Sequence, residues 1–137
     1  MRSVRASLLA LFALLTACAA EPVAQGDSRT PAAYSMGALK AVLPDSRRVQ
    51  AVTAAADASL RARGYAVTAT RATADSGHVY AKSPVRPGPF SLSPATYVDV
   101  SAQIVASGTE VSIKVGDFGD EPESRAILDD VLRRLGL

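Results

Sequence analysis

Two neighbouring segments near the C-terminus alternate strictly between apolar and polar side chains, and this pattern limits the fold more than any other feature of the chain. The apolar positions are Val98, Val100, Ala102 and Ile104 in residues 97–105, and Val111, Ile113 and Val115 in residues 109–116. A period of two is typical of a strand with one buried and one solvated face, and the Ser107-Gly108 link is typical of a hairpin. The chain therefore contains an antiparallel sheet that buries only one face.

Two amphipathic helices are predicted to cover that face. One begins after Pro44-Asp45 and ends at Gly64, and the other begins after Asp120. Their apolar stripes are Val49, Val52, Ala56 and Leu60 in the first helix, and Ile127, Leu128, Val131, Leu132 and Leu135 in the second. Spacings of three and four place each set on one helical face, and Asp45 and Asp120 are suitable N-caps.

The remaining segments complete the predicted fold. Residues 34–43 form a first strand that ends at Pro44, and residues 65–72 and 78–83 form a hairpin through the small polar residues 73–77. Residues 84–94 contain four prolines and are predicted to form a long surface loop. The expected fold class is α+β: a two-layer sandwich with an antiparallel sheet of about five strands and two helices on one face, in the order strand, helix, four strands, helix.

The N-terminal residues predict export and lipid attachment. Residues 1–5 carry two arginines, and residues 6–15 are apolar except for Ser7, which is the pattern of a secretion signal. Such a run spans roughly 15 Å as a helix, half of the bilayer's hydrocarbon core, so it is too short for a transmembrane anchor. The next residues, Leu15-Thr16-Ala17-Cys18, resemble the lipobox of bacterial lipoproteins. That resemblance implies a thioether-linked lipid on Cys18, with acyl chains such as palmitate, after removal of signal peptide 1–17.

The resulting organisation has three parts: the signal peptide 1–17, a lipidated N-terminus with a flexible tether over 18–33, and one α+β domain over 34–137. The tether is expected because residues 19–33 contain two prolines and a glycine without apolar periodicity. The alternative is a plain secretory signal cut after Ala17 or Ala20, with Cys18 incidental. Ala19 in place of aspartate resembles outer-membrane sorting in enteric bacteria, so the expected location is the cell envelope, on the periplasmic face of the outer membrane.

The C-terminal region also resembles a known family. Residues 109–135, TEVSIKVGDFGDEPESRAILDDVLRRL, combine a strand, a Gly-Asp-Phe-Gly-Asp turn and a helix, and Tyr34, Gly37 and Leu39 fit as well. With the lipobox, these residues resemble a domain-of-unknown-function family of small bacterial lipoproteins. The resemblance implies a fold and a location but no catalytic or ligand-binding residue.

Several site types lack the residues they need. The chain has 15 Lys and Arg against 13 Asp and Glu, and removal of Arg2 and Arg5 makes the two numbers equal, so no nucleic acid partner is expected. His78 is the only imidazole, so neither a histidine-rich zinc site nor a Cys-His nucleophilic pair can form, and we expect no enzyme activity, cofactor or metal. The carboxylates at positions 117, 120, 121 and 123 are interpreted as helix-start residues rather than a calcium site.

Strand parity identifies one surface of the sheet as a candidate binding site. If Val79 and Ala81 face the helices, Tyr80 and Tyr97 point outward together with His78, Lys82 and Asp99. Tyrosine is enriched at protein interfaces, so Tyr80 and Tyr97 are the partner-binding candidates, although β-propensity alone also explains them. The expected function is a noncatalytic interaction or accessory module of the envelope, held at the membrane by Cys18. The alternative is a small-ligand-binding or hydrolytic module in which residues 84–94 form a lid.

Overall fold

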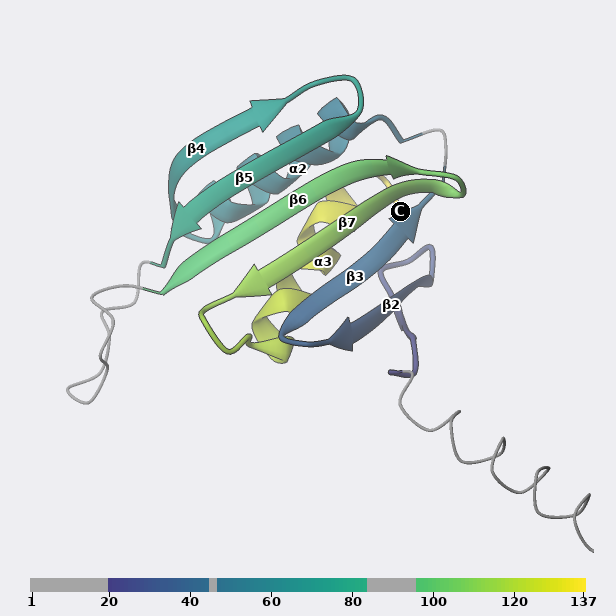
Figure 1. Cartoon of the computed structure of the whole chain (residues 1–137), viewed down its shortest axis with the longest axis horizontal. Helices are drawn as coiled ribbons and strands as arrows, with labels where there is room; N and C mark the ends of the chain where they lie inside the picture. The colour runs from purple at the N-terminus through teal and green to yellow at the C-terminus, as the bar shows by residue number, and fades with distance from the viewer. Residues whose placement is uncertain (1–19, 45–46, 84–95) are drawn as a thin grey trace, which may run out of the picture.

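The structure is a computed structural model that describes residues 20–44, 47–83 and 96–137. The described residues form seven strands and two helices (Figure 1). In chain order these are β1 (Val23–Gln25), β2 (Thr30–Ser35), β3 (Ala38–Leu43), α2 (Val49–Ala62), β4 (Ala66–Ala72), β5 (Ser76–Lys82), β6 (Tyr97–Val105), β7 (Gly108–Val115) and α3 (Glu121–Arg134).

All seven strands join one open antiparallel sheet in the order β1-β2-β3-β7-β6-β5-β4. Both helices lie behind the sheet, where α2 packs on β4, β5 and β6 while α3 packs on β7, β3 and β1 (Figure 1). The core lies between these two layers and includes Leu39, Val100, Ile113, Leu60 and Ile127, all almost completely buried. The α+β class with both helices on one face is therefore confirmed.

The expected number of about five strands is wrong, because the described part of the chain contributes seven. Residues 34–43 are not one strand: the chain reverses at Met36 and Gly37, whose φ angles of 51° and 77° lie in the left-handed region. Two successive left-handed residues match the twist of a hairpin, so β2 and β3 pair with each other. Because the sequence has Met-Gly here rather than the usual Asn-Gly, no turn was predicted at this position.

The expectation of a flexible tether up to residue 33 is also wrong for residues 23–33. This segment supplies β1 and most of β2, with Val23 opposite Ala32 and Gln25 opposite Thr30. Gln25, Thr30 and Ala32 are buried although they are small or polar. In such a strand the buried positions are hardly more apolar than the exposed ones, so the alternation is not visible in the sequence.

The two helices differ in how well their starts were predicted. Asp120 caps α3 as expected, since its Oδ1 accepts a hydrogen bond of 3.0 Å from the Glu123 backbone N–H. In α2 the expected stripe is buried, but the helix begins at Val49 after Arg48, which makes no side-chain cap bond. The predicted cap, Asp45, lies outside the described residues. Gly64 ends α2 as predicted, with φ of 84°.

The hairpin of β6 and β7 agrees with the predicted alternation except at Ile104. Ile104 has the parity of the helix-facing residues, yet its side chain is 57% exposed. It borders a cavity of about 340 Å³ together with Arg47, Arg48 and Val49. Because α2 begins only at Val49, Ile104 lies beyond the end of the helix layer.

Two turns touch each other at one end of the strands. The turn between β2 and β3 contains Gly37, and the segment between β7 and α3 contains Phe118 and Gly119. A methyl group on Gly119 would lie 2.5 Å from the Gly37 Cα and would overlap the Tyr34 hydroxyl. Gly119 thus allows a backbone approach that no other residue permits.

We predict that Gly119→Ala destabilises the protein by about 3 kcal/mol or more, because it adds this overlap to the cost of a left-handed alanine. Gly136→Ala is the matched control, since Gly136 has φ of 73° and no neighbour within 4 Å of the added carbon. The control should lose only the cost of a left-handed alanine, about 1–2 kcal/mol. Urea unfolding followed by circular dichroism measures both variants, and equal losses would contradict the packing argument.

Candidate functional site

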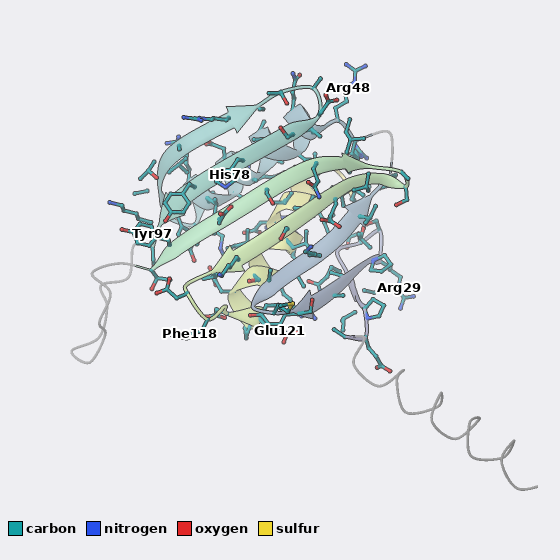
Figure 2. All side chains as sticks on the ribbon, viewed as in Figure 1. Arg29, Arg48, His78, Tyr97, Phe118 and Glu121 are labelled. Atoms are coloured by element: carbon teal, nitrogen blue, oxygen red, sulfur yellow. The ribbon has the colours of Figure 1, made fainter. Side chains whose placement is uncertain are left out.

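The face of the sheet opposite the helices carries the residues singled out from the sequence. Figure 2 looks onto this face, with His78 and Tyr97 labelled on β5 and β6. The register pairs His78 with Ser101, Tyr80 with Asp99, and Lys82 with Tyr97. These side chains alternate with the buried residues Val79, Ala81 and Val98, so they point away from the core. We call this surface, formed by β4, β5, β6, β7 and β3, the open face.

Three rings form a continuous stack on the open face. The Tyr80 and Tyr97 rings lie 5.3 Å apart between centroids at an interplanar angle of 17°, and the His78 ring lies 6.4 Å from Tyr80 at 12°. The Lys82 Nζ lies 5.8 Å from the centre of the Tyr97 ring, within range of a cation–π contact. Partial desolvation and the neighbouring Tyr97 and Asp99 raise the pKa of Tyr80 above its ordinary value. Tyr80 therefore stays a neutral hydroxyl at physiological pH.

The stack is also fixed by a polar contact across the strands. The His78 Nε2 lies 2.6 Å from the Asp99 Oδ1, and this contact becomes an ion pair when the imidazole is protonated. Both side chains are nearly half exposed, at 45% and 46%. Water competes strongly with an interaction at such exposure, so the pair orients the imidazole but gives little electrostatic strength for general-base chemistry.

Cations outnumber carboxylates on the open face. Strand parity and register place four cationic side chains and two carboxylates there: Arg71, Lys40, Lys82, Lys114, Asp99 and Glu110. The Lys40 Nζ and Glu110 Oε1 form a loose pair at 3.7 Å, and Gln103 donates a hydrogen bond of 3.2 Å to the same oxygen. The face thus combines an aromatic patch with a modest excess of positive charge.

A second candidate site is a cavity of about 580 Å³ lined by Arg63, Tyr65, Thr96 and Glu123. The Tyr65 hydroxyl donates a hydrogen bond of 2.5 Å to Glu123 Oε1, and Arg63 Nη2 donates to both carboxylate oxygens at 2.9 Å. Arg63 Nη1 also contacts Asp130 at 3.1 Å. These groups satisfy one another and join the end of α2 to the start of α3.

The hydrogen bonds in this cluster shift two pKa values in opposite directions. Burial alone would raise the pKa of Glu123, but the hydrogen bonds from Tyr65 and Arg63 outweigh it and hold that pKa below its ordinary value. Burial, followed by the bond to Glu123, raises the pKa of Tyr65 well above its ordinary value. At neutral pH the cluster therefore holds a carboxylate, a guanidinium and a neutral phenol.

Three of the four carboxylates around the start of α3 have structural partners, as their interpretation as helix-start residues predicts. Asp120 caps the helix, Glu121 pairs with Arg125 at 2.7 Å, and Glu123 belongs to the cluster with Arg63 and Tyr65. The described residues contain no group of three His, Cys, Asp or Glu side chains arranged to hold a metal ion.

The structure thus brings Tyr80 and Tyr97 together on one surface, while their role in binding stays a prediction. Cys18 and the 84–94 segment lie outside the described residues. The cluster around Glu123 was not predicted. Tyr65 and Glu123 are 58 positions apart in the chain, and no local pattern signals their contact.

Comparison with known proteins identifies a family but no activity. Residues 4–134 match the family described as "Protein of unknown function (DUF3568)". A search of curated proteins finds no match. The described residues also contain no helix that is long and apolar enough to cross a membrane.

We predict that Glu123→Gln lowers the free energy of unfolding by about 1–2 kcal/mol at pH 7, because Arg63 and Tyr65 lose a charged acceptor. The folded pKa of Glu123 lies below its unfolded value, so its contribution is complete above the unfolded pKa and disappears as the pH falls through the folded pKa. Wild type and variant should therefore converge in urea unfolding as the pH is lowered below about 4.

The matched control is Glu121→Gln, whose partner Arg125 lies one turn away on the same helix and whose own side chain is more exposed than that of Glu123, at 45% against 29%. It should lose about 0.3–0.5 kcal/mol. Equal losses for the two variants, or a Glu123→Gln deficit that persists at the lowest pH, would contradict the assigned role.

Proposed function

Since this chain belongs to the DUF3568 family of proteins of unknown function, its family membership names no function, and we propose a function from the sequence and the surface. The proposed protein is a bacterial envelope lipoprotein that is anchored through Cys18. Its domain is a noncatalytic module that binds a protein partner with its open face. The observation that carries the binding role is the Tyr80–Tyr97 stack. The proposed location is the periplasmic face of the outer membrane.

The anchoring half of the proposal rests on the lipobox-like residues 15–18 and the apolar run before them. A single thiol in an exported chain is otherwise an unpaired group in an oxidising compartment, and its use as a lipid attachment site explains its presence. Two or three acyl chains bury enough methylene groups to hold a small domain at a membrane, whereas one chain binds only reversibly.

The binding half rests on the composition of the open face. Tyr80 and Tyr97 present large rigid surfaces with few rotatable bonds, which are the properties of residues that dominate protein interfaces. The surplus of Lys and Arg around them favours a partner with an acidic rim, since complementary charge speeds association and discriminates between partners. We propose that this partner is a protein of the envelope whose contact surface covers the two rings.

The alternative function, binding of a small ligand, has a specific cavity to test. The cavity at Arg63, Tyr65 and Glu123 has the size of small-molecule sites. Its polar groups already bind one another, so a ligand would have to replace existing hydrogen bonds. That cost makes the open face the better-supported site.

We predict that wild-type protein purified from its own cells carries acyl chains on Cys18 and enters the detergent phase in a detergent partition experiment. Cys18→Ser lacks the thiol, so it should show no acyl mass. Intact mass spectrometry measures both proteins. A free thiol on wild-type protein recovered wholly in the aqueous phase would overturn the anchor.

We predict that Tyr80→Lys combined with Tyr97→Lys removes partner binding, because the change replaces the stacked rings by charge without disturbing the core. A photo-crosslinker at position 101, on the open face between the rings and β7, reports the contact in cells. In the double variant, the yield of the crosslinked product should fall about tenfold, which corresponds to the loss of one anchor residue from an interface.

The matched control is Ser76→Lys combined with Gln103→Lys, which adds the same charge to the other end of the open face. It should keep the crosslink. A crosslink that survives the tyrosine substitutions, or that disappears equally in the control, would contradict binding through Tyr80 and Tyr97.

A further inference from the structure

Two large apolar side chains are fully exposed on turns that touch each other. Met36, between β2 and β3, is 101% exposed, and Phe118, between β7 and α3, is 97% exposed. The turns meet through Gly37 and Gly119, as described above, and a methyl group on Gly37 would lie 3.0 Å from the Phe118 carbonyl oxygen. We call this pair of turns the apolar tip.

The fold does not account for either side chain. Met36 has φ of 51°, a conformation in which Asn, Asp and Gly are the favoured residues, so methionine adds backbone strain as well as exposed apolar surface. Phe118 lies beside Gly119 in a turn that needs a glycine but no aromatic ring. Exposed apolar groups at a strained position point to a contact outside the domain.

The start of the described chain lies at the same end of the molecule. Because β1 is antiparallel to β2 with Val23 opposite Ala32, the residues before Val23 lead toward Ser35 and Met36. Figure 1 shows the purple start of the described chain below β2, at the β1–β2 edge of the sheet, with the β2–β3 and β7–α3 turns to its left. Only two peptide steps separate Ala20 from Cys18, so their Cα atoms are at most about 7 Å apart.

We propose that the apolar tip inserts into the lipid surface beside the acylated N-terminus, with Met36 and Phe118 reaching the boundary between headgroups and acyl chains. This inference rests on the proposed lipid anchor at Cys18. Two side chains alone give weak membrane binding, but the anchor holds the tip next to the bilayer, where a weak insertion is sufficient to fix the orientation.

The charges around the tip indicate which lipid it fits. Asp117 and Asp120 flank the Phe118 turn, and Glu121 is paired with Arg125. Carboxylates near the ring disfavour a strongly anionic surface and are compatible with an amine-bearing zwitterionic headgroup, as in phosphatidylethanolamine. The proposed ligand of the tip is therefore a zwitterionic bilayer surface.

The absence of tryptophan from the chain permits a direct test. Acylated full-length Phe118→Trp, and separately Met36→Trp, are reconstituted into vesicles of phosphatidylethanolamine and phosphatidylcholine with brominated acyl chains. Gln103→Trp is the matched control, since position 103 is exposed and lies about 20 Å along β6 from Tyr97, at the other end of the strands. Relative to vesicles without bromine, the tip variants should lose about half of their emission and shift to the blue, and the control should change little.

The outcomes separate the inference from the function on which it rests. If intact mass and flotation show an acylated, vesicle-bound protein but both tip tryptophans stay unquenched, the anchor holds and the inference is wrong. A blue shift without bromine quenching would assign the tip to a protein contact, including a second copy of the chain, and would also overturn it. If the protein is not acylated and does not float, the proposed anchor fails and the inference fails with it.

Discussion

The whole arrangement depends on a sheet that can bury only one of its faces. The buried residues of β3, β5, β6 and β7 all point to the same side, so α2 and α3 have to share that side. The two helices then lie next to each other, and the contact of Arg63 with Glu123 and Asp130 joins them. No helix within residues 20–44, 47–83 and 96–137 covers the opposite side, which is why the aromatic stack of Tyr80 and Tyr97 is accessible.

The sequence predicted those elements whose residue pattern is compatible with only one local structure. The strict alternation in β6 and β7 and the Asp120 cap of α3 are of this kind. Strand parity also predicted that Tyr80 and Tyr97 share a face, because each alternates along its strand with apolar residues that face the helices. Their proposed function as a binding site, in contrast, depends on a partner that no residue pattern encodes.

The parts that could not be predicted depend on long-range contact. Gln25 is a polar residue that is buried where β1 packs against α3, and the buried Thr30 lies opposite it in the register, so β1 and β2 look like linker in the sequence. Met36 adopts its left-handed turn in a hairpin that also packs against the Phe118–Gly119 turn, far away in the chain. The Tyr65–Glu123 bond likewise appears only after α2 and α3 have packed together.

The early start of the sheet changes what an anchor at Cys18 would imply. A tether of fifteen flexible residues would let the domain tumble, whereas a first strand at Val23 leaves only residues 19–22 between the anchor and the sheet, which keeps the domain within a short reach of the bilayer. The Tyr97 end of the open face lies at the same end of the strands as the apolar tip, since the Tyr97 carbonyl accepts a hydrogen bond of 2.8 Å from the Gly116 N–H. In the proposed orientation, the aromatic patch therefore lies close to the lipid surface. A protein that binds this patch has to approach along the membrane, so the proposed partner is one that is itself held at the same bilayer.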